Sequence, residues 1–393
     1  MKVIPKWIGL GPVYYEMELE NTECDSPHLL ENFRPLAFLC KISLVLPIKN
    51  ILKPDSSLSF KLASFEVISA MLLNPCIGYI LVSKIHYDDD FKPNIIREAA
   101  AYLVSNTFFM FGQQTFLSLI EKIDRFDFSL SFCSKLCYFK SVSKYVWVLI
   151  PCIYPVVLVS VVGFSLYNGE SCTQYRCPLM ELVRGFFRYQ HHLQITIFMF
   201  FCYEIKLRFK TLNVAFYDFV KTSYLGKNVT VSNHSQLENY RLQYAWLIQC
   251  TKTLNDVFGW RFVFMFAVII LNAIWLLYFY YTEEGYVITG FDVLTQIFNF
   301  ALLLILTHNT DLMVKESQRI DGYLMEIPTQ DLDWATTFQL DHTFHQCEMF
   351  QVHMSASGMV SVEKSLLLGM AGAITMYYIA ILQMTTTEGS FTW

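Results

Sequence analysis

The sequence predicts an all-α membrane protein with seven transmembrane helices, and two observations lead to this fold class. Of the 393 residues, 54% are hydrophobic and only 16% are charged, which is more apolar than an ordinary soluble domain. The last apolar stretch, Leu366–Met384, holds nineteen residues without a formal charge. As a helix it would be about 28 Å long, close to the thickness of a bilayer's hydrocarbon core. Similar apolar stretches recur along the chain, and each predicts a membrane helix.

The predicted spans follow one another with polar segments between them. They cover Leu62–Val82, Ala99–Ile120, Tyr145–Tyr167, Leu193–Tyr203, Phe262–Tyr281, Val287–Leu306 and Leu366–Met384. The fourth is short, and full length requires residues 184–192, which hold two Arg and two His and need water or protein around them. Before the spans lies a polar segment, residues 1–61, whose apolar piece Pro35–Ile48 is too short to cross a membrane and predicts an interfacial helix.

The distribution of Lys and Arg predicts how the chain is oriented. Of these 29 residues, 23 fall in residues 1–61, 121–144, 206–261 and 307–365, and six fall in the alternate segments. Because cytoplasmic segments are enriched in Lys and Arg, the N-terminus is predicted in the cytoplasm and the C-terminus outside. The predicted layout is therefore a cytoplasmic segment (1–61), six spans (62–306), a second cytoplasmic segment (307–365), the last span (366–384) and an extracellular tail (385–393).

The last span has one face that differs from the rest. Small or polar residues follow each other there at spacings of three and four: Gly369, Gly372, Ala373, Met376, Ala380 and Gln383. Small residues let helices approach closely, and the amide of Gln383 needs a polar partner or water. This face is predicted either to pack against another helix, with Gln383 bonded across the contact, or to border a wet cavity.

The end of this helix resembles a known signature. Tyr377, then five mostly apolar residues, then Gln383 resembles the TYhhhhhQF signature (h, hydrophobic) of insect gustatory receptors, with Met376 and Met384 in place of the Thr and the Phe. Three further segments resemble the same family: IKLRFKTLN (Ile205–Asn213), TLNDVFGW (Thr253–Trp260) and FQVHMSASGMVSVEKSLLLGM (Phe350–Met370). The inverted orientation agrees with insect chemoreceptors. It is opposite to that of G-protein-coupled receptors, whose Asp-Arg-Tyr and Asn-Pro-x-x-Tyr signatures the sequence lacks.

This resemblance implies a ligand-gated cation channel, a homotetramer or heterotetramer with the last helix of each subunit around a central pore. The residues that it places at the pore or gate are Tyr377, Ile379, Leu382, Gln383 and Met384. Apolar rings close a pore by excluding water, and an inward amide ring would hydrate it, so a modest helix rotation would switch conduction.

The resemblance also implies a ligand pocket inside the bundle, open to the outside. The candidate ligand-binding residues are aromatic or polar: Tyr102, Asn106, Tyr154, Arg188, His191, Gln194, Asn272, Trp275, Tyr278, Gln296 and Asn299. A concave aromatic site with a few polar groups suits a small organic ligand. Aromatic residues near helix ends also form the ordinary interfacial belt, and the tandem histidines also serve as a polar cap of a span, so both alternatives stay open. Asn272 and Trp275 lie three apart, on one helix face, and are the preferred pair.

Other classes of function find no support in the sequence. Ser, His, Asp and Cys do not occur at nucleophile or metal-binding spacings, so we expect no enzyme, cofactor or metal site. No Lys/Arg tract points to nucleic acid. Cys172 and Cys177 fall in a predicted outer loop, where an oxidising environment would permit a local disulfide.

The resemblance therefore predicts a gustatory receptor subunit in the plasma membrane, multi-pass, in the dendrite of a gustatory receptor neuron. Its partners would be a small-molecule tastant, membrane lipid and other gustatory receptor subunits. Sugar-sensing relatives carry an acidic residue in the last-helix signature, which is absent here, so bitter plant compounds are favoured as ligands. The alternatives are a fructose-type sugar channel and a metabotropic seven-helix receptor.

Overall fold

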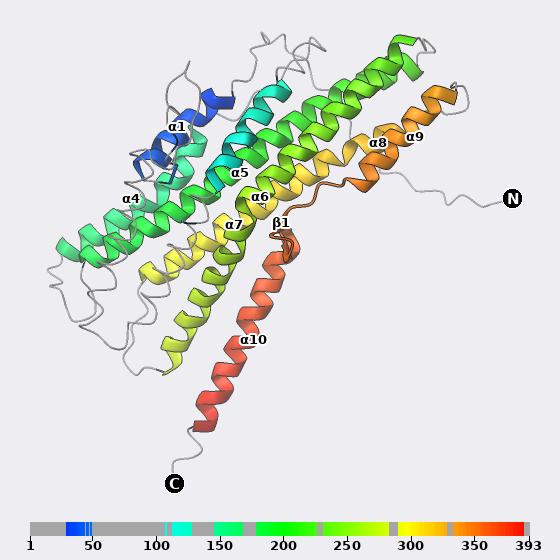
Figure 1. Cartoon of the computed structure of the whole chain (residues 1–393). Helices are drawn as coiled ribbons and strands as arrows, with labels where there is room; N and C mark the ends of the chain where they lie inside the picture. The colour runs from blue at the N-terminus through cyan, green and yellow to red at the C-terminus, as the bar shows by residue number, and fades with distance from the viewer. Residues whose placement is uncertain are drawn as a thin grey trace.

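The structure is a computed structural model in which long helices lie side by side and the last helix stands partly apart (Figure 1). It describes residues 29–43, 45, 46, 48, 107, 112–127, 145–167, 178–225, 231–282, 290–327, 332 and 334–388. The first two predicted spans, Leu62–Val82 and Ala99–Ile120, fall mostly outside these residues. Everything below concerns the part of the chain that is described.

The helices follow the order of the predicted spans. They are α1 (Leu29–Ile42), α4 (Val146–Tyr167), α5 (Pro178–Val220), α6 (Val231–Thr282), α7 (Gly290–Ser317), α8 (Arg319–Met325), α9 (Trp334–Met349) and α10 (Lys364–Glu388). A further unlabelled helix covers residues 112–127, and a short π-helical turn, Lys221–Leu225, ends α5. Among the described residues, three helical segments are long and apolar enough to cross a membrane: Ser235–Tyr278, Val293–Met325 and Lys364–Gln383.

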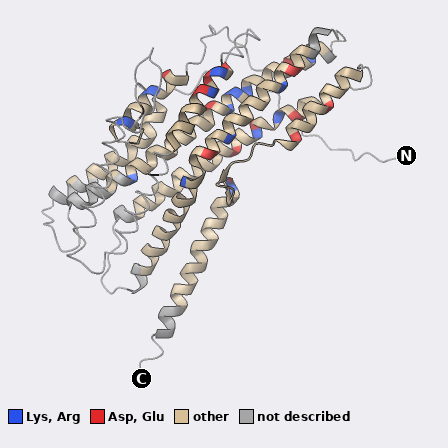
Figure 2. Cartoon of the chain, viewed as in Figure 1, with Lys and Arg blue, Asp and Glu red and all other residues tan. Residues whose placement is uncertain are grey.

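Two of the helices are much longer than a membrane is thick. At about 1.5 Å per residue, the 43 residues of α5 and the 52 residues of α6 extend about 65 Å and 78 Å. Neither contains a proline after its first residue, and the apolar stretch of each continues into polar sequence without a helix breaker. Both helices therefore run from the predicted membrane into the predicted cytoplasmic region, where charged residues gather around α8, α9 and the adjoining ends of α5 and α6 (Figure 2).

An aromatic core joins the helices. Phe33 of α1, Phe116 and Phe201 lie within 6.1 Å of one another by ring centroids, and all three are buried. Phe198 of α5 meets Phe262 of α6 at 4.5 Å. Edge-on aromatic pairs of this kind add to the free energy gained by burying apolar area.

The interfacial helix expected at Pro35–Ile48 differs from the observed α1, which begins and ends six residues earlier. Residues on one face of α1, including Phe33 and Leu36, are buried against α5 and α4. The opposite face keeps Phe38 and Ile42 exposed. Helix α1 begins before the apolar run Pro35–Ile48 because Phe33, which precedes that run, buries its ring against Phe116 and Phe201.

A small hairpin precedes the last helix. Strand β1 (Ser355–Ala356) pairs antiparallel with β2 (Val360–Ser361), and the turn between them contains Ser357 and Gly358 at φ of 51° and 73°. Glycine adopts this left-handed conformation without steric cost, which suits Gly358 to this turn. Helix α10 leaves this hairpin and extends away from the bundle (Figure 1).

Candidate ligand site and pore helix

A cluster of aromatic and polar side chains, some buried and some partly buried, lies between α4, α5 and α7. The imidazole of His192 is at its centre, with ring centroids 4.6 Å from Tyr154 and 4.9 Å from Phe298. Its Nε2 lies 3.0 Å from Oδ1 of Asn299, within hydrogen-bond distance. We refer to Tyr154, His192, Phe298 and Asn299 as the His192 cluster.

The local sequence explains how these helices come so close. A Cβ atom on Gly185 of α5 would lie 2.0 Å from Cδ2 of Leu158, so the glycine allows α4 to pack directly on α5. Leu158 and Tyr154, four residues apart on one face of α4, are both buried there. On α7, Phe298 and Asn299 are adjacent, and both reach His192. Side chains of α4, α5 and α7 therefore meet at the imidazole ring of His192.

The predicted pocket residues of α5 lie near this cluster. Arg188 and Gln194 are buried, and the ring of His191, which is partly buried, lies 6.3 Å from that of His192. Deeper in the bundle, the guanidinium of Arg261 is buried over the ring of Phe258 at 5.0 Å. The described part of the bundle thus carries basic and neutral polar groups at this level.

The other predicted pocket residues are distributed over α6 and α7. Asn272 and Trp275 are partly buried, and Trp275 lies 6.2 Å from the exposed Tyr278 by ring centroids. Gln296 is partly buried, one turn before Asn299. Asn299 belongs to the His192 cluster, whereas the preferred pair, Asn272 and Trp275, is not part of it. Tyr102, Asn106, Cys172 and Cys177 lie outside the described residues.

Two members of the cluster, His192 and Phe298, were not among the predicted ligand-binding residues. His192 was considered only with His191, because adjacent residues on a helix point about 100° apart and the sequence does not show which one faces inward. Phe298 stands in an apolar run and carried no signal of its own. Its position beside the polar Asn299, one turn after the polar Thr295, was the available indication.

The predicted pore residues lie on a helix that the rest of the chain barely covers. Among the described apolar side chains of α10, only Leu366 and Met370, both near its beginning, are buried. Further along, Leu368, Met376, Tyr377 and Ile379 are exposed, as is Gln383, whereas Leu382 is half-buried. The side chain of Met384 lies outside the described part. An apolar helix with so much free surface fits a position between other subunits or against lipid.

The beginning of α10 is held by two helices. From α7, the hydroxyl of Thr310 lies 2.9 Å from the carbonyl oxygen of Val362, and a carboxylate oxygen of Asp311 lies 3.1 Å from Nζ of Lys364. From α6, Oδ1 of Asn255 accepts a hydrogen bond from the backbone N–H of Ser355 at 3.0 Å. Burial raises the pKa of the Asp311 carboxyl, but the hydrogen bonds from Lys315 and Lys364 lower it by more, so its pKa falls below the usual value.

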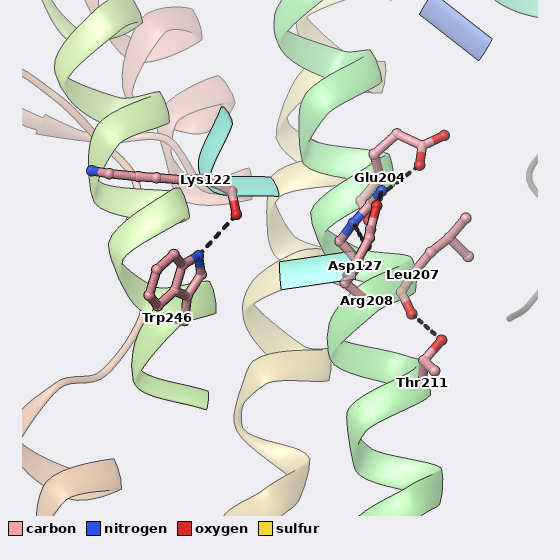
Figure 3. Close-up of polar contacts among 7 residues, drawn as sticks. All are labelled: Lys122, Asp127, Glu204, Leu207, Arg208, Thr211 and Trp246. Atoms are coloured by element: carbon pink, nitrogen blue, oxygen red, sulfur yellow. Dashed lines mark hydrogen bonds and ion pairs between the residues drawn. The ribbon is translucent and has the colours of Figure 1, made fainter. Parts of the chain in front are cut away.

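A buried ion cluster stabilises the predicted cytoplasmic end of the bundle (Figure 3). Nε of Arg208 donates to Asp127 at 2.8 Å, and Nη1 donates to Glu204, one turn earlier on α5, at 2.9 Å. Burial lowers the pKa of the Arg208 guanidinium, but the carboxylates of Asp127 and Glu204 raise it by more, so its pKa is raised overall. This cluster connects α5 to the helix of residues 112–127. The same helix is also connected to α6, because the indole N–H of Trp246 donates to the carbonyl oxygen of Lys122 at 2.8 Å.

Two hollows lie away from the His192 cluster. One is lined by Leu324 of α8 and by Trp334, Phe338 and Phe344 of α9, and the other by Ile270 of α6 with residues at the beginning of α10. Among the described residues, neither hollow is lined by a member of the His192 cluster. Within the described ranges, no three His, Cys, Asp or Glu side chains are placed to hold a metal ion.

Comparisons with known proteins agree with this architecture. Residues 67–388 match the family described as 7tm Chemosensory receptor. No curated protein matches the chain at a significant level. The solved structure of the insect olfactory receptor OR5 from Machilis hrabei in complex with eugenol has a TM-score of 0.65 at 13% identity, covering 91% of this chain and 99% of that chain. A second structure of the same receptor has a TM-score of 0.59 at 12% identity, with the same coverage.

These findings confirm the predicted fold class. At such low identity the likeness to the olfactory receptor concerns the fold alone, and that fold is the seven-helix fold of insect chemoreceptors. The matched family is a family of receptors and not of enzymes. Because the family match covers most of the sequence, the chain belongs to the 7tm chemosensory receptor family.

Proposed function

We propose that this chain is a gustatory receptor, a subunit of a cation channel opened by a small organic ligand in the plasma membrane of a taste neuron. The observation that carries the proposal is α10, an apolar helix that the chain leaves largely uncovered and that presents Gln383 on its exposed surface. Such a helix is suited to surround a central pore together with copies from other subunits, as homotetramer or heterotetramer. The segment from Tyr377 to Gln383 resembles the signature of gustatory receptors. This resemblance favours a taste receptor over an olfactory receptor.

The ligand is proposed to bind at or beside the His192 cluster. Aromatic rings with a few hydrogen-bonding groups suit a small organic molecule, and the solved olfactory receptor of the same fold is named in complex with eugenol, a small molecule. Plant-derived bitter compounds are our first choice of ligand. A fructose-type sugar is the second, because His192 and Asn299 offer polar atoms to a hydroxyl group.

Whole-cell recording from cells that express the chain tests this function. Denatonium, caffeine, eugenol and fructose would be applied one at a time, first to the chain alone and then with a second gustatory subunit. We expect a ligand-evoked cation current that persists when G-protein signalling is blocked. A current that disappears with that block, together with an N-terminal epitope that is labelled on intact cells, would instead establish a metabotropic receptor.

A pair of variants on α7 tests the site. Asn299→Ala removes the partner of His192, whereas Ile297→Ala, two residues away, changes a side chain that is exposed on the same helix. For the compound that evokes the largest current, we expect Asn299→Ala to raise the half-maximal concentration about tenfold, as for a lost buried hydrogen bond, and Ile297→Ala to change it little. Equal effects of the two variants would place the ligand elsewhere.

A further inference from the structure

Helix α7 touches both the His192 cluster and the beginning of α10. At the first place, Phe298 and Asn299 contact His192. At the second, Thr310 and Asp311 contact the segment that leads into α10. Asn299 and Thr310 are eleven residues apart, which is about three helical turns and about 16 Å, so they lie on nearly the same face of one continuous helix.

The lower contact combines a buried hydrogen bond with an ion pair. Thr310 is fully buried and Val362 is 1% exposed, so water cannot readily replace the bond between them. The same hydroxyl lies 2.8 Å from the carbonyl oxygen of Thr307 within α7, so its single proton is shared between an acceptor on α7 and one on the segment before α10. Asp311 adds a second link, because its carboxylate pairs with Lys364, the first residue of α10, as well as with Lys315 of its own helix.

Helix α10 also packs against α6 and α7, and the apolar side chains that are buried lie near its beginning. Its buried side chains, Leu366 and Met370, lie in its first two turns, and the remainder projects away from α6 and α7 (Figure 1). The helix has 25 residues and is about 37 Å long. A tilt of about 5° at its beginning would therefore move its far end by about 3 Å, which is enough to change the width of a narrow pore.

We propose that Thr310 and Asp311 are positioning residues through which α7 sets the angle of α10, so that a change at the His192 cluster reaches the pore helix at this joint. The inference rests on the proposed channel function for its physiological meaning. Its structural content, that α7 links the cluster to the direction of α10, is independent of which ligand opens the channel. Spatial connection alone does not establish energetic coupling, and a double-mutant cycle does.

The chain offers a matched control for each contact. Thr310→Val removes the hydroxyl that reaches Val362, whereas Thr307→Val removes a buried hydroxyl that bonds Leu304 of its own helix. Lys364→Gln removes the ion pair between α7 and α10, whereas Lys315→Gln removes only the pair within α7. Lys364 is more than half exposed, so its replacement decides the question if Thr310→Val fails to reach the cell surface.

The direction of α10 can be measured without a ligand. In the full chain, Ile379→Cys is modified by a membrane-impermeant methanethiosulfonate reagent on intact cells, and the rate is corrected by that of the parent chain. We expect Thr310→Val and Lys364→Gln each to change this rate about threefold or more, and their controls to leave it nearly unchanged. Asn299→Ala should also change the rate, but not when Thr310→Val and Lys364→Gln are already present.

The outcomes separate this inference from the proposed function. Equal rates for each variant and its control, or an effect of Asn299→Ala that persists in the double variant, would overturn the inference whether or not currents are recorded. The expected rates without any current from the chain, alone or with a second subunit, would support the joint and contradict the channel. Currents evoked by the compounds named above would additionally be expected to lose amplitude in Thr310→Val more than in Thr307→Val.

Discussion

Replacing Arg208 with methionine should destabilise the chain strongly. Its guanidinium is 2% exposed and pairs with Asp127 and Glu204, whose side chains are 12% and 1% exposed. Methionine fills a similar volume but leaves two carboxylates without their cation. Breaking a buried pair in this way costs about 3–5 kcal/mol, a large part of the roughly 5–15 kcal/mol that stabilises a typical domain.

The matched control is Arg125→Met on the helix of residues 112–127. Its pair with Glu121 is longer, at 4.0 Å, and both side chains are more than half exposed, so its loss should cost about 0–1 kcal/mol. Both variants would be heated in detergent, and the folded fraction would be followed by fluorescence-detected size-exclusion chromatography. We expect Arg208→Met to melt well below Arg125→Met, and Asp127→Asn with Glu204→Gln to restore part of the loss. Equal melting of the two arginine variants would show that the buried cluster contributes little.

Three shorter predictions concern the same predicted cytoplasmic region and α10. Gly259→Ala should lower the melting temperature and alter basal current, because its Cβ would lie 2.9 Å from the backbone nitrogen of Ser357; an unchanged melting curve would contradict this contact. Burial raises the pKa of Asp321 above 3.8, so the folded state disfavours its ionised form and loses stability as pH rises above that value. Asp321→Asn should therefore melt higher than the parent near pH 7, and a gain that is as large near pH 3.5 would refute the cause. Gln383→Ala should change open-channel current more than surface expression, whereas equal losses would indicate that the amide packs a helix contact.

The extent of the membrane helices could be predicted where an apolar stretch ends at a breaker, and not elsewhere. The third span, expected at Tyr145–Tyr167, is observed as Val146–Tyr167, and its last residue is followed in the sequence by Asn168 and Gly169, which disfavour a helix. By contrast, α5 continues seventeen residues beyond Tyr203, where the apolar stretch ends. Hydropathy marks the membrane, and helix continuation depends on backbone propensity. The absence of Gly and Pro from residues 204–220 was the sequence signal that α5 continues beyond Tyr203.

The candidate site was harder to predict, because its contacts join residues far apart in sequence. His192 and Asn299 are separated by 107 residues, and Asp127 and Arg208 by 81. Residue type and spacing indicate which face of a helix a side chain occupies, but not which helix that face meets. The pairing of α4 with α5 at Gly185 is decided by a close approach that only the packed bundle shows.

The long extensions of α5 and α6 support the beginning of α10. Asn255 of α6 binds the hairpin before α10, and Thr310 of α7 binds the residue that follows the hairpin, so the beginning of α10 is attached to two helices at once. A movement of α7 along α6 would shift these two attachments relative to each other, and this shift would change the angle of α10. For that movement to turn α10, the helices beneath must hold their own positions. The buried ion pairs of Arg208 join α5 to the helix of residues 112–127, and they would hold these two helices in place during such a movement.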